Sequence, residues 1–472
     1  MLFNSPEFLV FFLPATLLAF FVAAKLGRGQ TLVLLAASLA FYAAWSIRYL
    51  PLLLFSMAMN FGYGLLLQRW RGSRWLLGLG VASNLALLGY FKYAGFIVGS
   101  VGELLHLHLT APHIVLPLGI SFFTFTQIAF LVDAFQGKVV DKNPGRYALF
   151  VSFFPHLIAG PILHHEEMTS QFRDFARKRV TGIDLSVGIT IFIMGFIKKV
   201  ALADAFSPYV AAGFDHPGTA AAAWTAVLAY ALQLYFDFSG YSDMAIGLAR
   251  LLGVKMPENF NSPYKARSIA DFWTRWHMTL SRFLRDYLYV PLGGNRKGAV
   301  RTYVNVFVTM LLGGLWHGAA WTFVVWGALH GAYIVIARLW TTWAAPRGMR
   351  LGPFGAALTF LCVLLAWVPF RSRDLGAMTS MLYSMVGTGG IGRPDVQASA
   401  LIGVGLGIVW LLPNTQQLLM RYEPVLVDSR HTIRRGMFEW RFTPAFGIGA
   451  GLSFLCAILL ANDVSEFLYF QF

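Results

Sequence analysis

Apolar runs long enough to cross a lipid bilayer recur along almost the whole of this sequence. A transmembrane helix needs about 20 apolar residues to span a hydrocarbon layer of roughly 30 Å, and we count about 11 such runs. Of the 472 residues, 57% are hydrophobic and only 12% are charged. A soluble domain is about one quarter charged. The sequence therefore predicts an all-α polytopic membrane protein with about 11 transmembrane helices.

Positive charge is concentrated in short clusters between the apolar runs. Lys and Arg number 37 against 22 Asp and Glu, which gives a formal net charge of +15. Cytoplasmic loops of membrane proteins are enriched in Lys and Arg. This explanation accounts for the clusters better than a soluble face that binds nucleic acid. We therefore expect a multi-pass protein in contact with membrane lipid and without a nucleic-acid partner.

The apolar run at 147–163 differs from the others because basic residues lie near both of its ends. Its sequence, "FFPHLIAGPIL" at 153–163, is interrupted by proline and glycine. Irregular backbone at membrane depth is tolerated only where protein shields it. We therefore expect a re-entrant element that returns to the side from which it entered.

The segment at 268–289 is predicted to form one amphipathic helix at the membrane interface. Ser268 and Asp271 have the spacing of a helix start in which the serine caps backbone N–H groups. At about 100° per residue, an apolar face and a basic face separate. The apolar face holds Phe272, Trp276, Leu280, Phe283 and Tyr287, and the other side holds Arg275, Thr279, Arg282, Arg285 and Asp286. His277 falls on the apolar flank, and the arginines either anchor the helix or hold the phosphates of a cytoplasmic donor.

Two histidines lie in the strongly apolar stretch "MLLGGLWHGAAWTFVVWGALHG" at 310–331. An ionisable residue at membrane depth is costly and by default marks a functional site or a shielded polar network. His317 is surrounded by glycines, which allow a backbone or a ligand to approach closely. It is therefore a candidate base, with a buried hydrogen-bonded histidine as the alternative. For His330 we favour a packing role.

Other signals for chemistry in the sequence are few. Asp237 lies in an apolar run, where it either pairs locally with Tyr241 as a polar strut or belongs to a proton, ion or substrate path. No HExxH motif, cysteine pair, Walker loop or GxSxG element occurs, so no metal site is predicted. The pattern excludes neither an enzyme nor a transporter.

Several long blocks, in a fixed order, resemble the membrane-bound O-acyltransferase family, and in particular its bacterial branch that acetylates alginate. The blocks are "GYFKYAGF" (89–96), "LPLGISFFTF" (116–125), "FFPHLIAGPIL" (153–163), "QLYFDFSGYSDMAIGLA" (233–249), "FWTRWHMTLSRFLRDYLYVPLGGNRKG" (272–298) and "GGLWHGA" (313–319). The resemblance covers most of residues 1–340. It implies a single integral membrane domain at 1–472, with a family-like core at 1–340 and C-terminal transmembrane helices at 341–472.

The resemblance also implies an activity and its residues. Members move an acyl group from a cytoplasmic thioester to a hydroxyl, at a histidine where a passage from each side of the membrane meets. The catalytic positions that match are His317 and His277, and Trp276, Arg275, Trp316 and Asp237 are expected to bind substrate. His317 would act as the base or support the acyl transfer as charge develops, and His277 would orient the thioester or donate to the developing oxyanion. The glycines beside His317 would make room for the pantetheine arm.

The branch implies a bacterial inner membrane location and acetyl-CoA as donor substrate, with an acyl carrier thioester as the alternative and no bound cofactor. The acceptor is either an extracytoplasmic polysaccharide or a periplasmic acetyltransferase that receives the acetyl group. Two other classes compete with an enzyme: a secondary transporter, and a non-catalytic component of a polysaccharide export complex.

Overall fold

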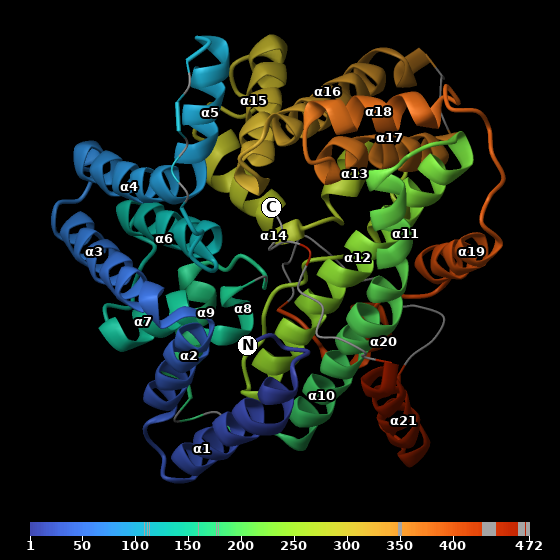
Figure 1. Ribbon diagram of the computed structural model, residues 1–472. Coiled ribbons are helices and arrows are strands. Elements are labelled where there is room, and N and C mark those ends of the chain that lie inside the picture. The colour runs from blue at the N-terminus through green and yellow to red at the C-terminus, as the bar shows by residue number, and fades with distance from the viewer. Residues whose placement is uncertain are drawn as a thin grey trace. The chain divides into compact units, whose positions relative to one another are not determined.

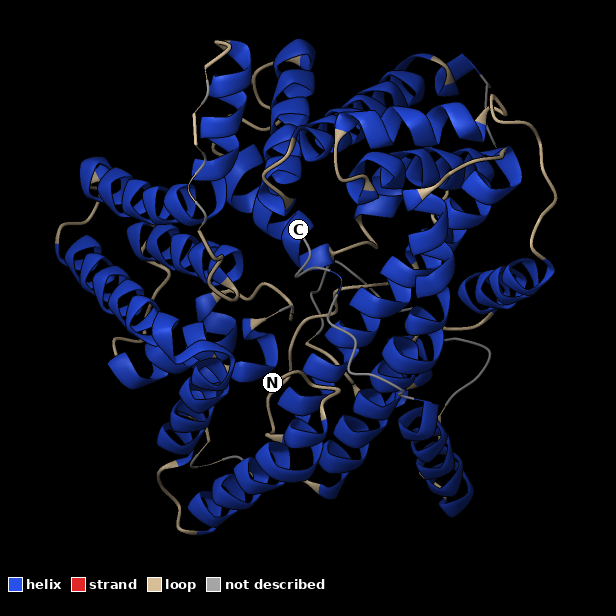
Figure 2. Ribbon diagram, in the orientation of Figure 1, coloured by secondary structure: helices blue, strands red, loops and turns tan. Residues whose placement is uncertain are grey.

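Helices joined by loops make up the structure, a computed structural model (Figure 2). It describes residues 1–107, 109–110, 112, 114–158, 160–175, 177, 179–347, 352–426, 440–460 and 468. Within those ranges the only extended pairing is one isolated bridge between Pro257 and Leu426. The predicted all-α class is confirmed.

Seven helical stretches in the described residues are long and apolar enough to cross a membrane. They are Glu7–Lys25, Gln30–Arg69, Arg74–Leu105, Gly182–Asp215, Ala299–His317, Trp321–Trp343 and Phe354–Arg371. Three shorter apolar helices accompany them: α6 (Ile120–Phe135), α19 (Val396–Leu411) and α21 (Pro444–Leu460). Long hydrophobic segments of this kind identify a multi-pass membrane protein.

The chain folds into two compact units, and their helices carry the labels of Figure 1. The first comprises Met1–Ile193, Tyr241–Pro257 and Tyr422–Asp428, and the second comprises Met194–Gly240, Glu258–Arg421 and Ser429–Phe472. This division does not test whether residues 1–472 form a single membrane domain. It does not test the boundary at residue 340 either, so both statements stay predictions.

In the first unit, buried amides connect the helices. Its elements are α1 (Leu13–Lys25), α2 (Gln30–Ser46), α3 (Leu50–Arg69), α4 (Arg74–Leu88), α5 (Ala94–Leu104), α6, α7 (Pro144–Ser152), α8 (Phe154–Leu157), α9 (His165–Arg173) and most of α10 (Gly182–Ile197). Asn60 on α3 and Asn84 on α4 exchange side-chain hydrogen bonds of 3.1 and 2.6 Å. The predicted break in the run at 147–163 is observed: Phe153, with ψ at 107°, separates α7 from the four-residue α8.

The second unit carries most of the residues singled out from the sequence. Its helices are α11 (Asp204–Asp215), most of α12 (Ala220–Leu251), α13 (Ile269–Trp273), α14 (Met278–Leu284), α15 (Ala299–His317), α16 (Trp321–Trp343), α17 (Phe354–Arg371), α18 (Leu375–Met385), α19, α20 (Thr415–Leu418) and α21. The helix α18 was not predicted, because its residues do not form an apolar run of spanning length.

The prediction of one continuous helix at 268–289 is wrong. Ser268 does cap the start, since its hydroxyl accepts a hydrogen bond of 3.1 Å from the Asp271 N–H. The helix then ends after Trp273, and α14 begins only after His277, whose φ of 43° and ψ of 53° are left-handed. The backbone N–H of Met278 instead donates to the carbonyl of Asn259, at 3.0 Å. Thr279, expected on the polar face, is consequently buried.

Candidate active site

His317 is the last residue of α15, immediately before the chain turns into α16. Its side chain lies inside an aromatic shell and is only 4% exposed. The ring centroids of Trp316, Trp326 and Phe370 are 5.1, 4.9 and 5.2 Å from that of His317. Three consecutive helices, α15, α16 and α17, therefore enclose this imidazole.

His277 lies next to His317, although the two are 40 positions apart in the sequence. Their ring centroids are 6.5 Å apart, and His277 is fully buried. Phe238 on α12 packs edge-on against the His277 ring at 4.8 Å. His277 is outside the membrane-spanning stretches, and burial lowers its pKa to about 3. It is therefore neutral at physiological pH.

The main-chain turn at His277 is held by the segment that precedes α13. Asn261 N–H donates to the carbonyl of Arg275 at 2.9 Å. The Nδ1 atom of His277 is 3.1 Å from the Oδ1 atom of Asn259. Asn259 was not predicted from the sequence. The signal that could have found it is a pair of amides in "ENFNS" at 258–262, next to an otherwise basic segment.

Of the residues predicted to bind substrate, Trp316 is at the histidine pair, with its ring 6.3 Å from that of His277. Trp276 packs on Phe272 and Trp367, at 5.7 and 5.0 Å between ring centroids. Arg275 forms an ion pair of 2.7 Å with Asp271. The substrate-binding roles of these three residues stay predictions.

Asp237 is buried in the second unit and its partner is a lysine. Lys199 Nζ lies 2.7 Å from the Asp237 carboxylate and 2.9 Å from that of Asp204. The predicted local pairing with Tyr241 is replaced by this ion pair, which joins α12 to the helical turn Lys198–Ala203. A salt bridge of this kind supports the polar-strut alternative, and substrate binding by Asp237 stays a prediction.

His330 is a packing histidine, as expected. It is fully buried, its ring is 4.7 Å from that of Trp326, and its Nδ1 accepts a hydrogen bond of 3.3 Å from the indole N–H of Trp273.

Gly314 and Gly318, on the two sides of His317, lie in close contact with α16, and the prediction that the glycines make room for a pantetheine arm stays a prediction. A Cβ atom on Gly314 would lie 2.3 Å from the carbonyl oxygen of Phe323 on α16. A Cβ atom on Gly318 would meet the ring of Phe323 at 2.0 Å. These glycines therefore allow the chain on both sides of His317 to approach α16 closely.

We expect Gly314→Ala to destabilise the second unit by about 1–3 kcal/mol, because the added methyl group must push two backbones apart. Thermal unfolding of the purified variant in detergent measures this. The matched control is Gly403→Ala in α19, where nothing lies within 4 Å of the added Cβ. The control should be neutral or slightly stabilised. Equal unfolding temperatures for the two variants would contradict the close contact.

A cavity in each unit lies among the described residues, and neither of these two is lined by His317 or His277. One, of about 430 Å³ in the second unit, is lined mainly by apolar side chains of α17 with Tyr264, Lys265 and Trp410. The other, of about 220 Å³ in the first unit, is lined by Asp133, Lys138, Val139 and residues 164–167. The passages to His317 that the resemblance implies stay a prediction.

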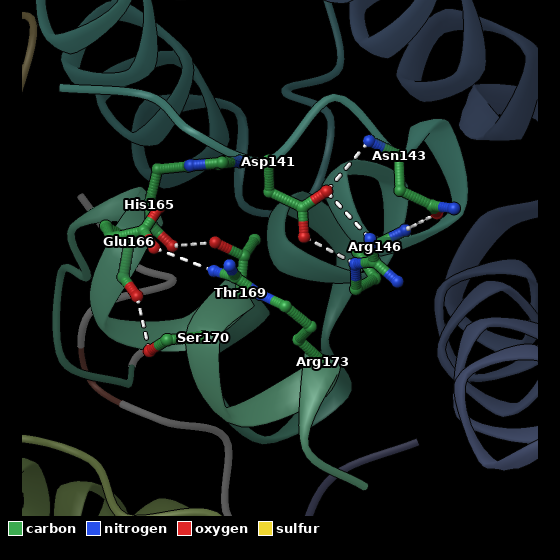
Figure 3. A network of polar contacts seen from close by, with 8 residues as sticks. All are labelled: Asp141, Asn143, Arg146, His165, Glu166, Thr169, Ser170 and Arg173. Carbon is green, nitrogen blue, oxygen red and sulfur yellow. Dashed lines mark hydrogen bonds and ion pairs between the residues drawn. The ribbon is translucent and has the colours of Figure 1, made fainter. Parts of the chain in front are cut away.

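Beside the smaller cavity, a polar network orders the loop between α6 and α7 and the start of α9 (Figure 3). Asp141 is paired with Arg146 and accepts a hydrogen bond of 2.9 Å from the Asn143 N–H. Burial alone would raise the pKa of Asp141, but these hydrogen bonds hold it below its usual value. His165 packs against the rings of Phe130 and Phe150, and burial lowers its pKa to about 4.

Comparison with known proteins identifies the family. Residues 136–370 match the model of the membrane-bound O-acyltransferase family. A peptidoglycan O-acetyltransferase of Helicobacter pylori is 38% identical over 517 residues, covering 100% of this chain and 98% of the relative. The chain belongs to the membrane-bound O-acyltransferase family. A probable alginate O-acetylase AlgI of Pseudomonas aeruginosa is 43% identical, covering 87% of this chain and 80% of the relative.

A more distant relative of this membrane-bound O-acyltransferase is the teichoic acid D-alanyltransferase of Bacillus subtilis, 29% identical over 48% of the chain and 60% of the relative. The resemblance seen in the sequence is thereby confirmed. The protein is a multi-pass membrane acyltransferase, and the transporter and scaffold alternatives are no longer the best accounts of it.

Proposed function

We propose that this protein transfers an acetyl group from a cytoplasmic thioester to a hydroxyl outside the cytoplasm, within the inner membrane of a bacterium. The acceptor is a cell-surface glycan or a periplasmic partner enzyme, and the donor is acetyl-CoA, with an acetylated carrier protein as the alternative. Relatives named as peptidoglycan and alginate acetylases support the glycan class. The observation that carries the proposal is the meeting of His277 and His317 at 6.5 Å in a buried, aromatic environment.

The reaction needs a base and little else. The acceptor oxygen attacks the thioester carbonyl carbon, a C–O bond forms and the C–S bond breaks. The hydroxyl proton passes to the His317 imidazole and then to the departing thiolate, so that the free thiol and the ester are the products. A general base of this kind contributes about 10²- to 10⁴-fold to the rate.

The aromatic shell also favours transfer over hydrolysis. Water attacks the same carbonyl carbon as the acceptor hydroxyl. Trp316, Trp326 and Phe370 surround His317 and keep bulk water from its ring. Excluding water from the site suppresses the wasteful reaction.

The proposal is tested with the purified full chain in lipid nanodiscs and acetyl-CoA labelled in the acetyl group. Isolated peptidoglycan, unacetylated alginate and a periplasmic extract are offered as acceptors, and acetylated carrier protein replaces acetyl-CoA in a parallel series. We expect label in an ester on one acceptor. Accumulation of labelled acetyl compound inside sealed vesicles, without any ester, would instead establish transport.

A further inference from the structure

Three hydrogen-bonding groups converge on the amide oxygen of Asn259, which lies in the loop before α13. The backbone N–H of Thr279 donates to Oδ1 at 3.3 Å, and the Thr279 hydroxyl donates to it at 2.9 Å. His277 Nδ1 is the third group, at 3.1 Å. The amide nitrogen of Asn259 is buried and has no hydrogen-bond partner among the described residues.

This arrangement determines where the oxygen of Asn259 is. A backbone N–H can only donate, so the atom that faces the Thr279 N–H must be the amide oxygen. With the amide reversed, two donors would face each other. Because the oxygen can only accept, His277 Nδ1 must carry the hydrogen, and the lone pair of the neutral ring is on Nε2.

We propose that Asn259 is a positioning residue that fixes His277 in the Nδ1–H form, so that Nε2 accepts a hydrogen bond from a hydroxyl of the acceptor glycan other than the one that attacks. The Nε2 atom lies on the far edge of the ring from Asn259, buried and without a partner among the described residues. The inference rests on the proposed function for the nature of the bound group, whereas the assignment of the tautomer does not.

The chemistry of the reactants selects the hydroxyl. A lone pair needs a hydrogen to accept, and neither the carbonyl oxygen nor the sulfur of a thioester carries one. The attacking hydroxyl gives its single hydrogen to His317, so the hydrogen that His277 accepts comes from a neighbouring hydroxyl of the glycan. In this form His277 has no hydrogen on Nε2 to donate to an oxyanion, and its lowered pKa of about 3 keeps it from acquiring one.

The backbone around His277 is built to hold this contact. A φ of 43° is unfavourable for a residue with a side chain, and such conformations persist where the surroundings impose them. Here the hydrogen bonds of Asn259 with Met278 and of Asn261 with Arg275 impose it. A histidine in a regular helix would not present Nδ1 to Asn259 in this way.

His330, in the same unit, is expected to have the opposite tautomer and serves as a reference for His277. The indole N–H of Trp273 can only donate, and it donates to Nδ1 of His330. His330 therefore carries its hydrogen on Nε2. Two buried histidines of one protein are thus expected to show opposite tautomers.

The test is nitrogen NMR of the full chain, labelled with ¹⁵N-histidine and embedded in lipid nanodiscs. The chain has 11 histidines, and the signals of His277 and His330 are assigned by their loss in His277→Gln and His330→Gln. We expect a protonated Nδ1 for His277 and a protonated Nε2 for His330. A protonated Nε2 on His277, or a mixture of both forms, would overturn the proposal.

Two variants of equal size test the role of Asn259 itself. Asn259→Leu removes the acceptor, so the His277 signal should move toward the Nε2–H form and kcat should fall by roughly 10²-fold, with KM for acetyl-CoA unchanged. Asn259→Asp keeps an acceptor oxygen and should retain the Nδ1–H signal and most of kcat. An unchanged tautomer in Asn259→Leu, or a loss confined to KM for acetyl-CoA, would refute the role.

A wrong role for Asn259 can be distinguished from a wrong assignment of acyl transfer. If no acceptor takes up label, the NMR spectrum still decides the tautomer of His277. If His277 proves to be the Nε2–H form while label is transferred normally, acyl transfer stands and the positioning role of Asn259 does not.

Discussion

Replacing His317 with alanine is expected to lower the rate of acetyl transfer by about 10²- to 10⁴-fold, the share that a general base contributes. The imidazole of His317 contacts all three rings of the shell formed by Trp316, Trp326 and Phe370. Initial rates of label transfer from acetyl-CoA to the identified acceptor measure the effect. KM for acetyl-CoA should change little, because the lost group acts on the proton of the acceptor.

The control for this variant is His216→Ala, which removes an exposed histidine from the same unit. It should transfer at the rate of the unchanged protein. Both proteins must elute as single species and unfold at similar temperatures, so that a rate difference reports chemistry. Normal transfer by a folded His317→Ala protein would rule out His317 as the general base.

Replacing Asp237 with alanine is expected to cost about 3–5 kcal/mol of stability, because it leaves the buried ammonium of Lys199 without its nearer partner. Asp204, 2.9 Å away and partly exposed, compensates for only part of the lost interaction. Thermal unfolding in detergent measures the loss. For the fraction that remains folded, we expect an unchanged KM for acetyl-CoA.

A double variant distinguishes a structural role of Asp237 from a role in substrate binding. Lys199→Met combined with Asp237→Leu removes both charges, and replacing a buried pair with apolar groups is often neutral or stabilising. The double variant should therefore unfold near the temperature of the unchanged protein. If it is stable but has lost affinity for acetyl-CoA or for the acceptor, Asp237 binds substrate and the strut account is wrong.

Much of the helical architecture could be predicted from the sequence, because burial in lipid demands long apolar segments and permits little else. The boundaries at α12, α15 and α17 follow directly from where those segments begin and end. The break at His277 could not be predicted from periodicity. An apolar flank continues through that position, and the turn is held there by hydrogen bonds to the segment of Asn259 and Asn261, well before it in the sequence.

At the candidate site, too, some residues could be predicted from the sequence and others could not. The resemblance singled out His317 and His277, and the structure brings the two rings together. Asp237 is 38 positions from Lys199, and a pairing across that distance leaves no local signal in the sequence. For the same reason Trp326 and Phe370, which complete the shell of His317, could not be distinguished from other aromatic residues in apolar helices.

The shell around His317 has a practical consequence for following the enzyme at work. Indole fluorescence is quenched by a nearby protonated imidazole, and the rings of Trp316 and Trp326 are 5.1 and 4.9 Å from that of His317. The chain contains 14 tryptophans, so the difference between the unchanged protein and a Trp326→Phe variant isolates one of these two reporters. Under the proposed role of His317 as the base, the fluorescence of Trp326 should fall while the imidazole carries the proton of the acceptor.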